Sequence, residues 1–142
     1  MKRALLALAL CGCVNDDIVL YETRVRGTVT AMATGTLHLE FHHATSFGEG
    51  PLAHPLGQFD GRVLPLMQSP YSLDETVLYS QQKGEGLVVY GWLDTDGDGV
   101  LCAVGKPAEP AGLVRVVGFP SHNVNISLLL DKQCLGSESP SF

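Results

Sequence analysis

The sequence predicts an all-β protein, a single antiparallel β-sandwich of about seven strands with Greek-key connections. Apolar and polar residues alternate in short runs, as they do in strands that have one buried face. Turn residues separate these runs roughly every 8–12 residues, a spacing typical of sandwiches. The 142 residues include sixteen Gly and eight Pro but only nine Lys and Arg. This composition favours turns over helices, and the length is enough for one domain with a core.

The chain begins with the features of an exported protein. Lys2 and Arg3 precede an apolar run over residues 4–10, which is typical of a secretory signal and too short to span a membrane. Residues 10–13, Leu-Cys-Gly-Cys, resemble the bacterial lipoprotein box, in which a small residue precedes a cysteine that is lipidated. An ordinary secretory signal with incidental cysteines is the alternative interpretation.

The lipoprotein resemblance implies a cellular location and attachment to a membrane. It implies a signal peptide over residues 1–12, lipidation of Cys13 and a tether over residues 13–20. Val14, rather than Asp, follows the cysteine, which favours the outer membrane, with the domain facing the periplasm or the cell surface. Several acyl chains would anchor the protein stably to that membrane.

The charge of the chain excludes one class of partner. The formal net charge is −6, and it falls to −8 when the signal peptide takes Lys2 and Arg3 with it. A protein of that sign is repelled by phosphate backbones, so we expect no nucleic-acid binding. An unknown protein or glycan remains as the expected soluble partner.

The strands follow in chain order. Residues 21–30 and 37–42 alternate with period two and are separated by a turn, so they predict two neighbouring strands. Residues 76–80 form a further short strand, and the almost continuously apolar residues 87–93 form a central one. Residues 113–117 and 124–130 complete the sandwich. The domain is therefore expected over residues 21–134, with a disordered tail over residues 135–142.

Residues 44–73 are predicted to be mostly a long surface loop. They contain eight Gly or Pro residues, too many for a long helix, and long loops often carry binding sites. Within them a short strand is expected over residues 62–66, and Pro65 places it at the edge of a sheet because proline cannot donate to the ladder.

An acidic loop follows the central strand and is the strongest candidate site. Asp94, Asp96 and Asp98 alternate with no basic residue among them, and hard carboxylate oxygens in a glycine-rich turn suit Ca²⁺. Val100 would add a backbone carbonyl, as position seven of an EF-hand does. The loop is not an EF-hand, because Gly105 stands where a glutamate is required; Glu109 could supply the missing oxygen. A solvated acidic turn is the alternative.

Other polar side chains support weaker hypotheses. Cys102 and Cys134 are the pair left once Cys11 is cleaved off and Cys13 is lipidated, so an exported protein would join them in a disulfide; two buried thiols are the alternative. His38, Glu40 and His42 share one strand face and could hold Zn²⁺ or Cu²⁺, although an outward polar face is the preferred interpretation. The aromatic residues Phe41, Tyr90 and Trp92 are expected in the core rather than on a glycan-binding platform.

The central segment, Gly84 to Gly112, resembles a group of secreted bacterial β-sandwich proteins related to transthyretin and prealbumin-like domains. The resemblance rests on a glycine-to-tyrosine strand, an acidic loop and a proline-containing segment that ends in glutamate: Gly86-Leu87-Val88-Val89-Tyr90, Asp94-Thr95-Asp96-Gly97-Asp98-Gly99 and Gly105-Lys106-Pro107-Ala108-Glu109. It implies a transthyretin-like fold and a metal loop, and it implies no known reaction.

Together these features predict a cell-envelope module with a structural or interaction role and a calcium-stabilised loop. A small exported binding protein for a carbohydrate or a metal ion is the alternative. We expect no enzyme, because the sequence carries no nucleophile elbow, zinc-protease motif or phosphate-binding glycine loop. A hydrolase with an unrecognised site is the third hypothesis.

Overall fold

A computed structural model describes residues 20–44, 57–80, 86–116 and 122–135. Within these ranges the protein is all-β. The eight strands are β1 (Leu20–Ala31), β2 (Gly35–His43), β3 (Gln58–Leu66), β4 (Tyr71–Ser80), β5 (Leu87–Asp94), β6 (Pro110–Val116), β7 (Asn123–Leu130) and β8 (Lys132–Gln133). The described ranges hold no helix long and apolar enough to cross a membrane. The predicted signal peptide, Cys13 and the predicted tether up to residue 19 lie outside the described residues, as do residues 45–56 and 136–142.

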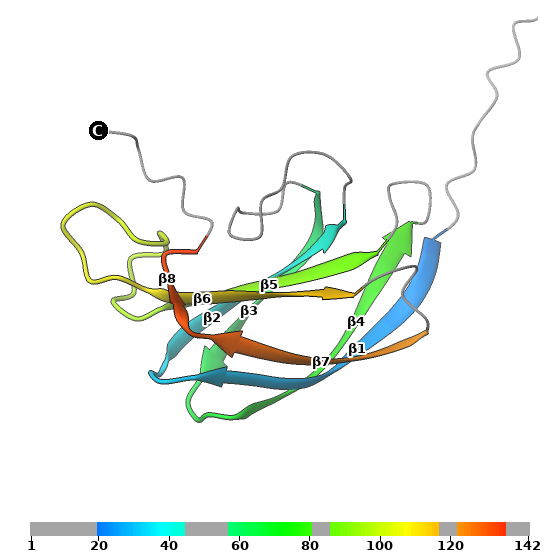
Figure 1. Cartoon of the computed structure of the whole chain (residues 1–142), viewed down its shortest axis with the longest axis horizontal. Helices are drawn as coiled ribbons and strands as arrows, with labels where there is room; N and C mark the ends of the chain where they lie inside the picture. The colour runs from blue at the N-terminus through cyan, green and yellow to red at the C-terminus, as the bar shows by residue number, and fades with distance from the viewer. Residues whose placement is uncertain (1–19, 45–56, 81–85, 117–121, 136–142) are drawn as a thin grey trace, which may run out of the picture.

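The strands form two sheets that pack face to face (Figure 1). The smaller sheet has the order β4-β1-β7, and the larger has the order β3-β2-β5-β6-β8. Two predicted positions are confirmed: β5 is the middle strand of the larger sheet, and β3, which contains Pro65, is an edge strand. The two-layer, all-β architecture predicted from the alternation is present.

The prediction of a purely antiparallel sandwich is wrong at one pairing. β1 and β7 run parallel, with residues 24–31 opposite residues 123–130, while every other pairing in the described strands is antiparallel. Alternation reports which face of a strand is buried and carries no information about its neighbour or direction. The sequences of β1 and β7 therefore do not indicate that these two strands pair with each other.

The predicted long loop over residues 44–73 is also largely wrong where the structure describes it. Residues 58–66 and 71–80 are strands, joined by a short turn. Gly61 and Pro65 lie inside β3, which an edge strand tolerates because one of its sides needs no hydrogen-bond partner. The number of glycines and prolines was a poor guide here, since their positions in the sheet matter more than their frequency.

The core lies between the two sheets. Seventeen buried apolar residues form it, and the burial of β7 alternates strictly along the strand, as its sequence pattern predicts. Phe41 is fully buried there, as expected. The members are Val25, Val29, Ala31, Leu37, Leu39, Phe41, Leu66, Leu73, Val77, Tyr79, Leu87, Val89, Leu93, Val124, Ile126, Leu128 and Leu130.

A second apolar cluster lies apart from this core. Tyr90, Trp92, Ala111 and Leu135 form it, and it follows the outward-facing positions of β5 and β6. The two aromatic residues are buried, as predicted, but outside the core between the sheets. Leu135, which the sequence assigned to the disordered tail, is only 6% exposed. The end of the described chain thus covers part of the outer face of the larger sheet.

Different contacts close the two open sides of the sandwich. On one side, Arg62 of β3 reaches across to β4, where it donates to the Glu75 carboxylate at 3.0 Å and to the Thr76 carbonyl at 3.0 Å. On the other side, β6 approaches β7 so closely that a Cβ on Gly112 would lie 2.0 Å from the Leu129 carbonyl oxygen. The guanidinium of Arg62 therefore joins the sheets on one side, and Gly112, which has no side chain, lets them approach closely on the other.

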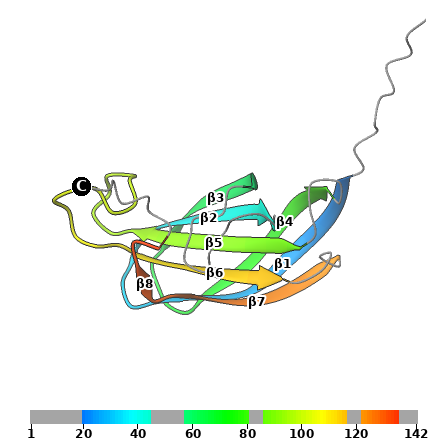
Figure 2. The same ribbon diagram turned by 45° about the horizontal axis from the view of Figure 1, so that its top comes forward.

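The loop between β5 and β6 lies at one end of the molecule. β8 lies at the same end, and β1 begins at the opposite end (Figures 1 and 2). The acidic loop and Leu20, the first described residue, are therefore separated by the length of the sandwich.

Candidate metal centre

The acidic loop begins where β5 ends, at Asp94, and finishes at Pro110, where β6 begins. Strands therefore flank the loop, as the sequence predicts, and the loop is not an EF-hand. Gly97 and Gly99 have φ angles of 79° and 74°, in the left-handed region that side chains disfavour. These two glycines let the chain turn back repeatedly around the aspartates.

Asp94 organises the first half of the loop. Its residue is 5% exposed, and its two carboxylate oxygens accept the N–H groups of Gly97 at 2.6 Å and Gly99 at 3.0 Å. Burial by itself raises the pKa of Asp94, but these hydrogen bonds and the nearby His38 ring outweigh it and hold the pKa below its ordinary value. Asp94 is therefore a buried carboxylate kept ionised by backbone donors.

Glu109 organises the second half. It is 2% exposed, and its oxygens accept the N–H groups of Thr95 at 2.9 Å and Cys102 at 3.1 Å. The side chain thus holds the start of the loop to its middle. The sequence indicated this glutamate as a source of oxygen for the loop, and the structure brings it there.

Asp94, Asp96 and Glu109 come together. One carboxylate oxygen from each residue lies within 4.8 Å of the others. Elsewhere in the described ranges no three His, Cys, Asp or Glu side chains converge in this way. Each oxygen that accepts one N–H group keeps a second lone pair, and three hard carboxylates are ligands that Ca²⁺ prefers. The donor chemistry of this cluster therefore fits a calcium ion.

Asp98, a further predicted ligand, lies outside this group of converging carboxylates, and Val100 is the predicted ligand that would contribute its backbone carbonyl. The Asp98 carboxylate accepts the Val100 N–H at 2.8 Å and lies 3.8 Å from the Lys106 ammonium. Val100 is 55% exposed. The same ammonium lies 3.3 Å from Asp96, and the Asp96 hydrogen bond is the first cause of a raised Lys106 pKa. Lys106, which the sequence analysis left without a role, thus supplies positive charge to the exposed aspartates.

A disulfide joins Cys102 to Cys134, as predicted for an exported chain. Glu109 lies against both ends of it. Its backbone N–H donates to the Cys102 sulfur at 3.2 Å, and its carbonyl accepts the Cys134 N–H at 2.8 Å. Sequence spacing gives no sign of this contact, because it depends on how β8 pairs with the start of β6.

The histidine hypothesis has a different outcome. His42 bonds the Glu40 carboxylate at 2.8 Å, so these two side chains share a face of β2 as expected. His38 stacks on Trp92, with ring centroids 4.0 Å apart and planes 10° apart. The three do not meet as a group of ligands. His42 is fully buried rather than part of an outward polar face.

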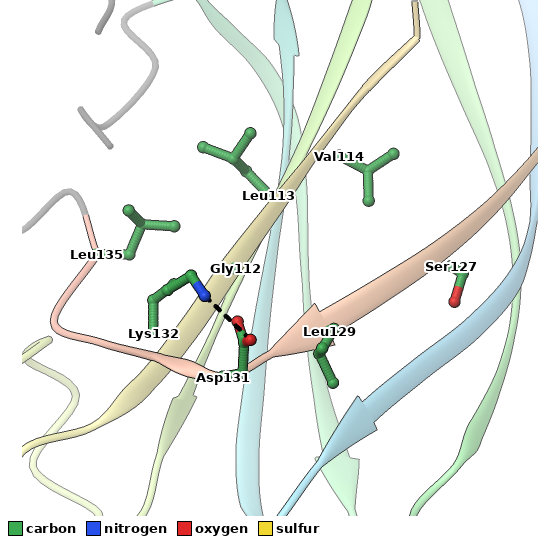
Figure 3. Close-up of a pocket in the computed structure, with 8 residues that line it drawn as sticks. All are labelled: Gly112, Leu113, Val114, Ser127, Leu129, Asp131, Lys132 and Leu135. Atoms are coloured by element: carbon green, nitrogen blue, oxygen red, sulfur yellow. Dashed lines mark hydrogen bonds and ion pairs between the residues drawn. The ribbon is translucent and has the colours of Figure 1, made fainter. Parts of the chain in front are cut away.

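A shallow pocket lies at the seam between β6 and β7 (Figure 3). Its volume is about 230 Å³, below the roughly 300–1,000 Å³ of typical small-molecule sites. Its charged residues, Asp131 and Lys132, pair with each other at 3.0 Å. Its walls consist of Gly112, Leu113, Val114, Ser127, Leu129, Asp131, Lys132 and Leu135.

Comparison with known proteins adds no further assignment: no protein-family model, curated protein or solved structure matches the chain.

Proposed function

We propose that the protein is a lipid-anchored cell-envelope module whose acidic loop is stabilised by Ca²⁺ and whose role is structural or interactional. The observation that carries the calcium assignment is the convergence of Asp94, Asp96 and Glu109 within 4.8 Å, with two of the three residues buried. The proposed role is non-catalytic. Transthyretin-like topology belongs to the same proposal and rests on the sequence resemblance.

Electrostatics supports the assignment. Like charges that share a small volume raise each other's free energy, and the effect is largest where solvent is excluded. The four backbone N–H groups that contact Asp94 and Glu109 offset this repulsion only partly, because they are dipoles rather than full charges. A bound cation would supply the compensating charge, with the exposed Lys106 ammonium released to solvent.

The arrangement of the ends supports the anchored orientation. If Cys13 is lipidated, the tether enters the sandwich at Leu20, and the acidic loop lies at the far end (Figure 1). The loop would then project away from the membrane surface. A rigid, cation-bound loop in that position suits contact with a partner in the periplasm or at the cell surface.

Calcium titration by calorimetry tests the assignment. We expect metal-free protein to bind one Ca²⁺, and Asp96→Asn to abolish binding. Asp96 is the suitable position because its one described backbone acceptor role, to the Asp98 N–H at 3.2 Å, lies at the exposed surface, so the fold survives the change. Asp131→Asn, which removes an exposed carboxylate that is not among the three converging ones, is the matched control and should bind as the wild type does. Absence of binding at millimolar Ca²⁺ would reject the assignment.

The alternative function, a small exported protein that binds a soluble ligand, has less support. The seam pocket is small, and its two charged groups are already paired. We therefore favour the calcium-stabilised module.

A further inference from the structure

The disulfide lies at the edge of the fold rather than in its core. Neither Cys102 nor Cys134 belongs to the cluster between the sheets. Both residues are partly exposed, so a reductant can approach them. The bond joins the middle of the acidic loop to the residue that follows β8.

Both cysteines hold strained backbone. Their φ angles are 52° and 55°, and they are the two non-glycine residues with positive φ in the described ranges. Residues with a side chain keep this conformation only where the surroundings enforce it. At each cysteine the backbone N–H is held by Glu109, through the carboxylate at Cys102 and through the carbonyl at Cys134. The disulfide and these two hydrogen bonds therefore form one constrained unit.

This unit also holds a cover over the second apolar cluster. Leu135 follows Cys134 directly and packs with Tyr90 and Trp92. The Tyr90 hydroxyl donates a hydrogen bond to the Leu135 carbonyl, and burial raises the Tyr90 pKa well above its ordinary value. Besides the disulfide and the hydrogen bonds of Cys134 and Leu135, the described end of the chain is attached through β8, which has two residues and pairs with Pro110 and Ala111.

We propose that the Cys102–Cys134 disulfide is a redox-sensitive clamp. When it is reduced, the acidic loop and residues 131–135, which include β8, come away and expose Trp92 and Tyr90, while the smaller sheet and the strands β3, β2, β5 and β6 of the larger sheet remain folded. The separation is possible because the seventeen-residue core includes neither the loop nor the end of the chain. The inference does not depend on cation binding.

The chemistry requires a dithiol reductant. One of its thiolates attacks a cysteine sulfur, the Cys102–Cys134 bond breaks, and a mixed disulfide forms. The second thiol of the reductant then attacks this mixed disulfide and displaces the cysteine sulfur that is bound in it. The protein gains two electrons and two protons as two thiols, and the reductant leaves as a cyclic disulfide.

The single tryptophan provides the readout. Trp92 is the only tryptophan in the chain and lies in the cluster that Leu135 covers. The full-length protein would be titrated with dithiothreitol, with alkylation and peptide mapping to confirm thiols at Cys102 and Cys134. We expect tryptophan emission to move to longer wavelength and the amides of Thr95 and Cys134 to lose hydrogen-exchange protection. Far-UV circular dichroism and the protection of β1 and β2 should be retained.

Two variants sharpen the test. The double variant Cys102→Ser/Cys134→Ser should show the red-shifted emission without reductant and should not respond to dithiothreitol. Leu135→Ala keeps the disulfide, so it should retain protection at Thr95 while its emission shifts. Unchanged emission and protection after both cysteines are mapped as thiols would overturn the proposal. Loss of the far-UV signal on reduction, or failure of the double variant to fold, would also overturn it, because the disulfide would then support the whole fold.

Discussion

Asp94 and Glu109 each hold two backbone N–H groups of the loop, so their carboxylates have a structural role besides any metal. An amide in place of either carboxylate has a single acceptor oxygen. It would turn an NH₂ group toward one of the two backbone donors. Substitutions at these two positions therefore affect the apo protein as well as the cation-bound form, whereas Asp96 reports mainly on the cation.

Asp94→Asn should destabilise the apo protein by about 1 kcal/mol, since one partly buried N–H, of Gly97 or Gly99, loses its acceptor. The effect depends on pH with a defined sign. Because the folded-state pKa of Asp94 is lowered, its contribution is complete above the unfolded-state pKa of about 3.9 and is lost as pH falls through the lower folded-state value. Urea unfolding at a series of pH values should show the wild type and the variant converging in acid. Parallel curves down to the lowest pH would contradict this role of Asp94.

Lys106→Gln should strengthen Ca²⁺ binding severalfold, because the ammonium that lies 3.3 Å from Asp96 and competes with the cation for that carboxylate is removed. The lysine is half exposed, so we expect little change in the stability of the apo protein. Calcium titrations of both proteins at low ionic strength measure the difference, and added salt should diminish it. Lys132→Gln, which removes an ammonium paired with Asp131, is the control. Weaker binding in Lys106→Gln would mean that Asp96 does not face the ion.

Part of this site could be predicted from single residues. Three alternating aspartates predicted an acidic loop, and Glu109 was the nearest further carboxylate. The structure shows that Asp98 lies outside the group of three carboxylates, that Lys106 approaches both Asp96 and Asp98, and that the disulfide lies against Glu109. Neither feature has a sequence pattern, because both depend on the path of the fifteen-residue loop between β5 and β6 rather than on strand or helix periodicity.

At the scale of strands, alternation identified most of the elements and misjudged their partners. β7 alternates strictly and β5 is buried throughout, and both patterns were readable. The parallel pairing of β1 with β7 was not, since register and direction arise from long-range contacts. The strand predicted over residues 62–66 covers only the second half of β3, because an edge strand also accepts a glycine such as Gly61 that a central strand tolerates poorly.

Gly112→Ala should destabilise the protein by about 2–4 kcal/mol, because a new Cβ would overlap the backbone of β7 at Leu129 and push the two strands apart. Gly61→Ala is the matched control. There the nearest atoms are 3.2 Å away, and one of them is the end of the flexible Gln58 side chain, so the change should cost less than about 1 kcal/mol. Equal losses for the two variants in urea unfolding would show that the seam between β6 and β7 is not tightly packed.

In the molecule as a whole, the two ends of the sandwich carry different features. β1, through which an anchored chain would enter, begins at one end, and the acidic loop and β8 lie at the other (Figure 2). The disulfide agrees with the proposed export of the protein, because disulfides form and persist in oxidising compartments outside the cytoplasm. The proposed calcium site is compatible with the same location. We propose that a bound cation stabilises the acidic loop, at the end of the sandwich opposite the start of β1.

Thermal unfolding with Ca²⁺ and with a chelator tests that claim most directly. An ion that binds only the folded state stabilises it by about 2.7 kcal/mol at a hundredfold excess over Kd. If Ca²⁺ binds the acidic loop, we expect a clear rise in Tm with Ca²⁺ for the wild type and for Asp131→Asn, and no rise for Asp96→Asn. A wild-type Tm that is the same in millimolar Ca²⁺ and in chelator would contradict it, and the loop would then be an acidic turn held by its own backbone hydrogen bonds.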